Sequence, residues 1–191
     1  MRVALLDDYQ DVALRTVDWS VLGPGFEVVA FHDHVSEPDA LVERLRDFEV
    51  VMAMRERTAF PRSVLERLPN LRLLVTAGMR NAAIDVAAAT ALGVTVSGTG
   101  GRGYATAELT WGLILALARH IPEEHLAIQS GRWQTSVGLE LRHKVLGLVG
   151  LGNLGTEVAK VGLAFGMEVI AWSQNLTPER AAERGVTRVE R

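Results

Sequence analysis

The stretch Lys144-Val145-Leu146-Gly147-Leu148-Val149-Gly150-Leu151-Gly152-Asn153-Leu154-Gly155 decides the fold of this chain. An apolar run typical of a buried strand leads directly into glycines with the spacing G-x-G-x-x-G. In a strand–turn–helix unit, Gly150 permits the tight turn, Gly152 lets backbone N–H groups approach a pyrophosphate, and Gly155 lets the helix pack closely on the strand. The helix N-terminus also favours negative charge. The stretch therefore predicts a dinucleotide-binding turn, which also includes Asn153 and Leu154.

The sequence after the turn supplies the context that this motif requires. In a chain with 18 glycines, the spacing alone is weak evidence. Apolar residues then recur at helical spacing, at Leu154, Val158, Val161 and Phe165, and Met167–Trp172 reads as a second strand. The pattern predicts a β-α-β unit built around the glycine turn.

The position expected to recognise the ribose carries no acidic residue. A carboxylate about 20 residues beyond the glycines would accept hydrogen bonds from the 2′-hydroxyl of NAD. Ser173 stands at the end of the second strand instead, and Arg180 follows and can offer a cation to a 2′-phosphate. NAD and NADP are both left open as the cofactor, and so is a simple polar strand cap at Ser173.

Composition places the chain among ordinary globular proteins. It has 191 residues, of which 48% are hydrophobic and 23% charged, with a formal net charge of −3 and no cysteine. The charge favours neither nucleic acid nor an anionic membrane as a partner, and the missing cysteines exclude a disulfide framework and a thiolate site. No apolar run reaches the length of a membrane span or a signal peptide. A cytoplasmic location is the expectation.

Short apolar runs alternate with helical patterns before the glycine turn. This order is typical of a parallel sheet with helices on both faces. We expect a first domain over residues 1–100 and a second over 101–191. The strands are expected at Val3–Leu6, Glu27–Phe31, Val50–Met52, Leu73–Val75 and Val94–Val96, and the helices near Glu37–Asp47, Pro61–Leu68 and Ile84–Ala91.

A long apolar helix is predicted over Tyr104–Arg119. Apolar residues surround it almost completely after Thr110, so we expect it to be buried, between domains, against a second subunit, or both. Trp111 is interpreted as a packing residue. Trp133 in the following polar loop is either an oligomer contact or a surface anchor. These features predict a homodimer in the full-length protein.

Taken in order, these motifs resemble the D-isomer-specific 2-hydroxyacid dehydrogenases, including phosphoglycerate dehydrogenase-like members. The resemblance extends along the whole chain. It implies an α/β fold in which a flavodoxin-like substrate domain precedes the first part of a Rossmann dinucleotide-binding domain. Its other elements are Leu73–Gly78, Leu92–Thr99, Ala107–Thr110 and Gly131–Trp133.

The resemblance implies an oxidoreductase that transfers a hydride between a nicotinamide cofactor and a 2-hydroxy or 2-keto acid. In the family, backbone N–H groups of the loop after the fourth strand hold the substrate carboxylate, and this loop corresponds here to Gly78-Met79-Arg80-Asn81, with Gly78, Met79 and Arg80 as the expected binding residues. Arg80 replaces a glycine, so it either contacts the carboxylate or faces solvent. Arg55 resembles an arginine near the substrate anion, with a solvated loop arginine as the alternative. Thr106 matches a position near the nicotinamide, with helix capping as the alternative.

No catalytic residue can be assigned by resemblance. The family's arginine, glutamate and histidine correspond to positions beyond Arg191, so we expect the chain to be the N-terminal part of such an enzyme. The alternative is a dinucleotide-binding protein or fragment without turnover, similar to corepressors that share the fold. The identity of the acid, the activity of this chain alone and the status of Arg191 as a natural terminus are left open.

Histidines and aspartates outside these motifs give weaker signals. His32 and His34 flank Asp33 in a pattern that can bind a metal, but without a clear third ligand we interpret them as surface residues and expect no metal. Asp7-Asp8 after the first strand resembles the acidic pair of a receiver domain. The third strand, Val51–Met54, lacks the phosphoacceptor aspartate that a receiver requires.

Overall fold

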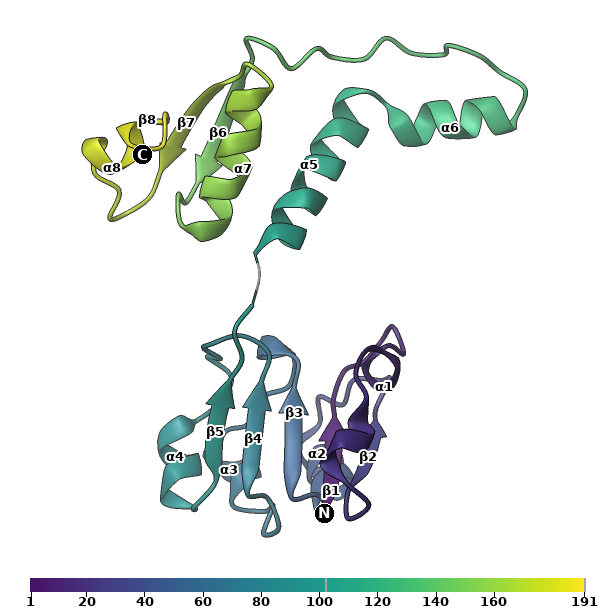
Figure 1. The fold of residues 1–191 in the computed structure, drawn as a ribbon, viewed down its shortest axis with the longest axis vertical. Helices are drawn as coiled ribbons and strands as arrows, with labels where there is room; N and C mark the ends of the chain where they lie inside the picture. The colour runs from purple at the N-terminus through teal and green to yellow at the C-terminus, as the bar shows by residue number, and fades with distance from the viewer. Residues whose placement is uncertain (102, 191) are drawn as a thin grey trace. The chain divides into compact units, whose positions relative to one another are not determined.

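The computed structural model describes residues 1–101 and 103–190 (Figure 1). The chain divides into two compact units, Met1–Gly101 and Arg102–Arg191. This division falls beside the boundary expected after residue 100. None of the helices in the described residues is long and apolar enough to cross a membrane.

The first unit is built on a five-stranded parallel sheet, as the sequence predicts. The strand order is β2-β1-β3-β4-β5, so the order reverses between β1 and β3. Ligands of open α/β sheets commonly bind beyond the carboxyl ends of the strands at such a reversal. The strands are β1 (Arg2–Leu5), β2 (Glu27–Ala30), β3 (Val50–Ala53), β4 (Leu73–Thr76) and β5 (Thr95–Gly98).

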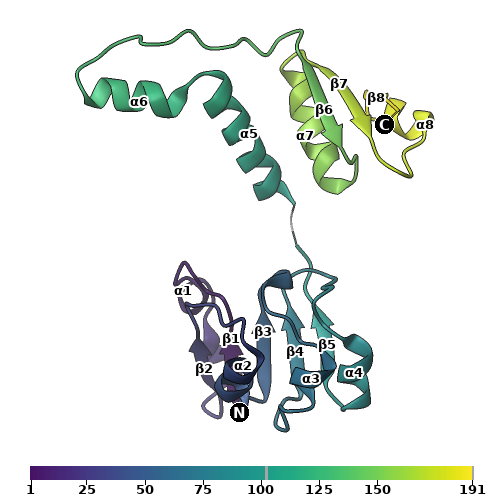
Figure 2. The ribbon, with the colours of Figure 1, turned by 180° about the vertical axis from the view of Figure 1, so that it is seen from behind.

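The longer helices of the first unit pack on one face of this sheet (Figure 2). Side chains of α2, α3 and α4 form one apolar core with Val51 and Leu74, which are fully buried. The helices are α1 (Ala13–Thr16), α2 (Pro38–Leu45), α3 (Arg62–Leu65) and α4 (Val86–Ala91), with 3-10 turns η1 (Trp19–Leu22) and η2 (Arg55–Arg57).

Residues of α1 and η1 line a cavity with Met52 on the other face, so helices lie on both sides of the sheet, but those on this side are short. In the described residues, α1 and η1 are short and bury none of their own residues. Met52 and Val75 on this face are half-buried, and Thr95 and Ser97 are exposed. Alternating burial along β3 and β4 is the result, because one side of each strand faces the helical core and the other does not.

The second unit contains the predicted β-α-β arrangement. Its parallel sheet has the order β6-β7-β8. The helix expected after the glycine turn lies between the first two strands in the chain and packs against both. The elements are β6 (Val145–Val149), α7 (Asn153–Ala164), β7 (Glu168–Trp172), α8 (Pro178–Ala182) and β8 (Thr187–Arg188).

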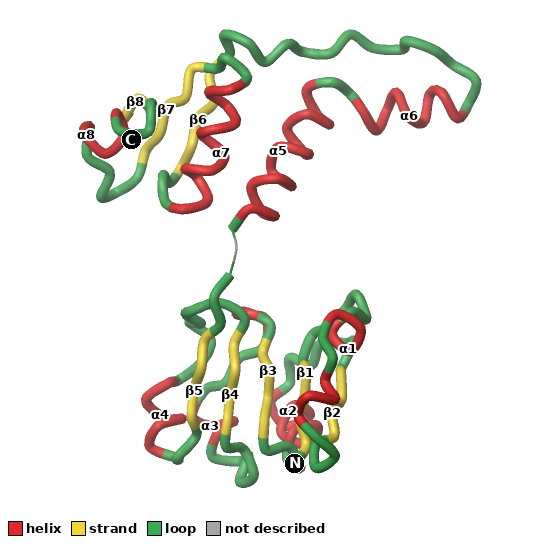
Figure 3. The backbone as a smooth tube through the Cα atoms, in the orientation of Figure 1, coloured by secondary structure: helices red, strands yellow, loops and turns green. Residues whose placement is uncertain are grey.

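Two further helices, α5 (Tyr104–Ala118) and α6 (Ile121–Gln129), precede this arrangement, and a long loop connects them to β6 (Figure 3). The interpretation of Trp111 as a packing residue is confirmed. Its ring stacks on Phe165 with centroids 5.0 Å apart, and its indole Nε1 donates to the Val158 carbonyl at 3.1 Å. A Cβ on Gly162 would collide with Leu146 and crowd Val169, so this glycine lets the helix lie close to the sheet.

Within this single chain the long helix is buried only in part, so its burial against a second subunit stays a prediction. Only Ala107 and Trp111 of α5 are buried, whereas Leu109, Leu113 and Leu117 are 64%, 58% and 77% exposed. Apolar residues lie all around α5, but α7 and its neighbours cover only one side of it, so the other sides are exposed in this chain. Trp133 in the following loop is also exposed.

Candidate functional site

The glycine turn has the backbone that the motif predicts. Gly150 follows β6 directly with φ of 105°, a left-handed conformation that favours glycine. Its N–H donates to the Trp172 carbonyl at 2.7 Å, which fixes the turn to the end of β7. Gly152 is the N-cap of α7, and no side chain caps this helix end. The first-turn amides of α7 therefore lack the side-chain acceptor that commonly occupies a helix N-terminus.

The glycines of the turn have different surroundings. A Cβ on Gly155 would overlap the Gly150 carbonyl oxygen, so this position closes the turn rather than packing on the strand as expected. A Cβ on Gly152 would meet no atom within 4 Å. The space beside Gly152 is therefore open at the N-terminus of a twelve-residue helix. Such a position suits an anionic group, because N–H groups and the helix dipole converge there.

The start of α5 lies beside this turn. A Cβ on Gly103 would collide with Leu154, the second residue of α7. Thr106 is exposed and is the third residue of α5, whereas the N-cap is Gly103 without a side-chain cap. The capping alternative for Thr106 is therefore wrong, since a capping hydroxyl belongs at the N-cap.

Ser173 lies at the end of β7, next to the glycine turn. Trp172 pairs with Val149 in the sheet, so the residues that follow them, Ser173 and Gly150, lie at the same edge of the sheet. Arg180 is exposed, and its guanidinium donates to the Asn175 carbonyl at 3.5 Å. Arg184 donates from Nε to the Thr156 hydroxyl at 3.2 Å, which joins α8 to the first turn of α7. Sequence reasoning missed Arg184, for which no local pattern exists.

The second group of predicted residues lies beyond the carboxyl ends of β3, β4 and β5 in the first unit. Gly78 has φ of 98°. Its N–H donates to the Thr99 hydroxyl at 3.0 Å, and its carbonyl accepts from the Thr99 N–H at 3.2 Å. A Cβ on Gly98 would lie 2.9 Å from the Gly78 oxygen and from the Met79 Cα. A glycine at position 98 therefore lets the loop approach β5 closely.

Arg55 lies against this loop. A Cβ on Gly78 would overlap the Arg55 guanidinium, so the two residues are in direct contact. Arg55 has φ of 54°, a left-handed conformation that costs a non-glycine residue roughly 1–3 kcal/mol. The Asn81 side-chain amide donates to the Arg55 carbonyl at 2.6 Å and to the Thr76 hydroxyl at 2.9 Å. The structure thus brings together Arg55 and the predicted loop, although Arg55 is 23 positions before Gly78 in the sequence.

Met79 and Arg80 form the exposed part of the loop. Together with Asn81 they line a cavity of about 360 Å³ whose other lining residues are Thr76, Ile84, Val86, Val96 and Gly98. No carboxylate lines this cavity. In the described residues, the N–H groups of Met79 and Arg80 find no hydrogen-bond acceptor. Two free amides and two nearby guanidinium groups form an environment that favours a carboxylate.

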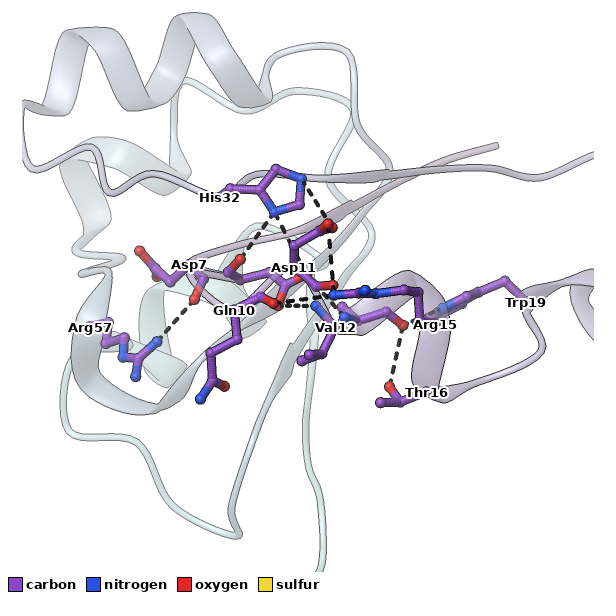
Figure 4. A network of polar contacts seen from close by, with 11 residues as sticks. Asp7, Gln10, Asp11, Val12, Arg15, Thr16, Trp19, His32 and Arg57 are labelled. Carbon is purple, nitrogen blue, oxygen red and sulfur yellow. Dashed lines mark hydrogen bonds and ion pairs between the residues drawn. The ribbon is translucent and has the colours of Figure 1, made fainter. Parts of the chain in front are cut away.

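The residues around the first histidine pattern have separate partners. Asp33 binds Arg44 with N–O distances of 2.9 and 2.6 Å, and His34 contacts Asp7 at 2.8 Å. The three residues of the His-Asp-His pattern therefore do not form a common site. His32 instead lies near Asp8 and Asp11, where ligand atoms of all three fall within 4.8 Å of one another (Figure 4).

The Asp8 carboxylate is engaged by the backbone. Its two oxygens accept from the N–H groups of Ala13 at 3.0 Å and Val12 at 3.1 Å. These bonds, chiefly that from Ala13, lower the pKa of Asp8 despite its burial. The ionised Asp8 side chain therefore holds the segment after β1 in place through these two hydrogen bonds. The bonds explain why an acidic residue is buried here without a ligand.

The two groups of residues define an α/β protein with a dinucleotide-type glycine turn in one unit and, in the other, a loop whose Met79 and Arg80 amides have no acceptor among the described residues. Residues 111–191 match the model of the D-isomer specific 2-hydroxyacid dehydrogenase, NAD binding domain. The chain is accordingly similar to the D-isomer specific 2-hydroxyacid dehydrogenases, and residues 111–191 of its second unit correspond to their NAD-binding domain.

Individual relatives give the extent of this similarity. A D-3-phosphoglycerate dehydrogenase of Methanocaldococcus jannaschii is 36% identical over 80% of this chain and 29% of its own length. A hydroxypyruvate reductase of Thermotoga maritima is 39% identical over 71% of this chain and 45% of its own. The crystal structure of a phosphoglycerate oxidoreductase from Vibrio cholerae matches with a TM-score of 0.88 and 37% identity, covering 99% of this chain and 61% of that one. The chain thus spans less than half the length of these two curated relatives.

Proposed function

We propose that this chain binds a nicotinamide dinucleotide and the carboxylate of a 2-hydroxy or 2-keto acid, as part of an oxidoreductase that transfers a hydride between them. The observation that carries the proposal is the open space at Gly152, at the uncapped N-terminus of α7. A pyrophosphate there would be held by the first-turn amides, and Asn153, Leu154 and Gly155 would surround it. The bound cofactor would supply or accept the hydride.

The loop of the first unit supports the choice of substrate class. Met79 and Arg80 provide unpaired N–H groups, and Arg55 provides a guanidinium held beside Gly78. Together these groups would hold a carboxylate by charge-assisted hydrogen bonds. Arg80 would add a second positive charge, which favours an acid with a further anionic group. Of the relatives' names, D-3-phosphoglycerate dehydrogenase is consistent with such an acid, because phosphoglycerate carries a phosphate, whereas hydroxypyruvate has a single carboxylate.

The choice between NAD and NADP depends on Ser173 and the residues after it. Neutral groups at the end of β7 neither bind the ribose as a carboxylate would nor repel a 2′-phosphate. Arg180 is exposed a few residues further on, where it can approach such a phosphate. Thr106 lies about one helical turn after Gly103, which lies against Leu154 beside the glycine turn. We assign Thr106 to the nicotinamide side of the cofactor.

Calorimetry with NADH and NADPH on this chain is the first test. Binding of either would support the glycine turn as the cofactor site, and loss of binding in Gly152→Ala would locate it. Hydride transfer is then followed as the change in NADH absorbance with hydroxypyruvate as the keto acid. Cofactor binding without turnover would favour the alternative of a binding protein, and absence of binding by the folded chain would contradict the proposal.

We further propose a homodimer that uses the exposed leucines of α5. Leu109, Leu113 and Leu117 recur at helical spacing and are all more than half exposed, which is unusual for a run of leucines in a monomer. Sedimentation velocity tests this. Leu113→Glu is expected to shift a dimer to monomer, and a monomeric unaltered chain would contradict the assignment.

A further inference from the structure

The backbone of Arg55 is the feature of the first unit that most needs an explanation. Its φ of 54° lies in a region that non-glycine residues adopt only when surrounding contacts determine it. Arg55 begins the 3-10 turn η2 one residue after β3, and its guanidinium lies against Gly78. The contacts that hold this turn therefore fix the backbone from which the Arg55 side chain reaches Gly78.

Asn81 holds the turn from the side of the loop. Its amide donates to the Arg55 carbonyl at 2.6 Å and to Thr76 Oγ1 at 2.9 Å. Thr76 is only 3% exposed, so the anchor is a buried strand residue. The Asn81 carbonyl accepts in turn from the Ala83 N–H at 2.9 Å, which fixes the amide orientation.

Asp7 holds the turn from the end of β1. Its carboxylate is 1% exposed and accepts from the Thr58 hydroxyl at 2.8 Å, with the His34 ring nitrogen also at 2.8 Å. The Asp7 carbonyl accepts from Arg57 Nη1 at 2.9 Å, as Figure 4 shows. Arg57 and Thr58 are the last residue of η2 and the residue that follows it. Both ends of the turn are therefore anchored to buried groups on neighbouring strands.

We propose that Asp7, Thr58 and Asn81 are positioning residues that hold the Arg55 guanidinium beside Gly78, ready to bind the substrate carboxylate. This inference rests on the proposed function, in which Arg55 contacts that carboxylate. A guanidinium already held in place loses less conformational freedom when it binds an anion than a mobile one does. The positioning residues do not touch the substrate and act through Arg55.

The test uses oxalate as a non-reacting carboxylate probe and measures its affinity for the chain by calorimetry. Thr58→Val removes the hydroxyl at nearly constant shape, and Thr58→Ser keeps it as the matched control. We expect Thr58→Val and Asn81→Ala to weaken oxalate binding about three- to tenfold, with Thr58→Ser close to unaltered. Asp7→Asn removes a negative charge, so simple electrostatics would strengthen binding, whereas loss of positioning would weaken it.

A double-mutant cycle separates positioning from any direct effect. Arg55→Lys keeps the charge but loses the fork-shaped guanidinium, and we expect it to weaken binding about tenfold. In that background Thr58→Val should add less than about a twofold change, because it acts through Arg55. An equal effect of Thr58→Val in both backgrounds would overturn the inference.

A second measurement reports on Arg55 without a ligand. In ¹H–¹⁵N spectra we expect a distinct Arg55 Nε–H signal in the unaltered chain, and its movement to the position of mobile arginines in Thr58→Val. An unchanged signal would overturn the inference. The proposed contact between Arg55 and the substrate fails if oxalate does not bind the unaltered chain or if Arg55→Lys leaves oxalate binding unchanged. If Arg55→Lys weakens binding but Thr58→Val and Asn81→Ala do not, only the role of the positioning residues is refuted.

Discussion

The two proposed anion sites are built in different ways. The turn at Gly150–Gly155 uses backbone amides and a helix N-terminus, and all of its parts are adjacent in the chain. The loop at Gly78 combines backbone with the Arg55 side chain, and it is held by contacts among residues at or beyond the carboxyl ends of the strands. A turn built from adjacent backbone groups keeps its geometry when residues elsewhere in the unit are changed, provided that the fold is preserved. A site assembled from distant residues depends on contacts that lie outside it.

The largest expected effect tests whether each unit has its own core. Trp111→Ala removes a buried ring that packs on α7 and donates to Val158. We expect a loss of about 3–5 kcal/mol in the stability of the second unit, with the unfolding of the first unit unchanged. Urea denaturation followed by circular dichroism measures both. Trp133→Ala, at a 73% exposed residue, is the control. Equal destabilisation of both units would contradict their separate cores.

The next prediction separates the effect of the glycine turn on stability, tested at Gly155, from its effect on cofactor binding, tested at Gly152. Gly155→Ala places a Cβ on the Gly150 carbonyl and should cost about 1–3 kcal/mol in unfolding free energy. Gly152→Ala meets open space, so its stability should change by less than about 0.5 kcal/mol while NADH affinity falls at least about tenfold. Thermal unfolding and calorimetry test the pair. Retained NADH binding in Gly152→Ala would place the cofactor elsewhere.

Cofactor preference provides a smaller and more specific test of the second unit. Ser173→Asp introduces the carboxylate that binds the ribose hydroxyls of NAD and repels a 2′-phosphate. The ratio of NADH to NADPH affinity should rise about tenfold. Ser173→Asn has nearly the same size without the charge and should leave the ratio near that of the unaltered chain. An unchanged ratio in Ser173→Asp would remove this position from the cofactor site.

The smallest expected effect concerns the stability of each unit at low pH. In each unit a hydrogen-bonded carboxylate is suited to this comparison, Asp8 in the first and Glu124 in the second. Hydrogen bonds lower the pKa of Asp8, mainly from the Ala13 N–H, and that of Glu124, mainly from the Ser136 hydroxyl and then Thr135. A lowered pKa in the folded state stabilises the protein above the unfolded pKa, and this contribution is lost as the pH falls through the folded value.

We therefore expect Asp8→Asn to reduce the dependence of the first unit's melting temperature on pH below about 4. Glu124→Gln should do the same for the second unit only. Melting temperatures between neutral pH and pH 3 provide the measurement. A pH dependence identical to that of the unaltered chain in both variants would show that other carboxylates dominate acid unfolding.

Local patterns predicted most of the strands and helices and the second-unit site. Apolar runs of three to six residues identified the strands, and the glycines after Val149 identified the turn, because each signal depends on neighbouring residues. Short helical elements such as α1, η2 and α8 were missed, since three to five residues contain too little helical periodicity. The predicted burial of α5 is only partly met within this chain, because hydrophobicity shows that a face needs a partner without showing whether the same chain supplies it.

The first-unit site was predicted only in part. Arg55, Met79 and Arg80 followed from the family resemblance. Asn81 was predicted only as part of the loop, without its side-chain contacts, although it has the spacing of a turn-forming asparagine that accepts from the N–H two residues later. The contacts of Thr58 and Thr99 were missed. Nothing in the sequence near Asp7 indicates its bond to Thr58, which is 51 positions away.

The sequence by itself determined the parallel α/β architecture, the glycine turn and the absence of a carboxylate at Ser173, because backbone preference and hydrophobic periodicity are local properties. Only the tertiary structure decided that Arg55 lies against Gly78 and that Asp7 and Asn81 hold its turn. Parallel strands bring their carboxyl ends to one edge of the sheet, so residues far apart in the chain become neighbours there. Which of their side chains meet depends on sheet order and register, and those arise from packing of the whole unit.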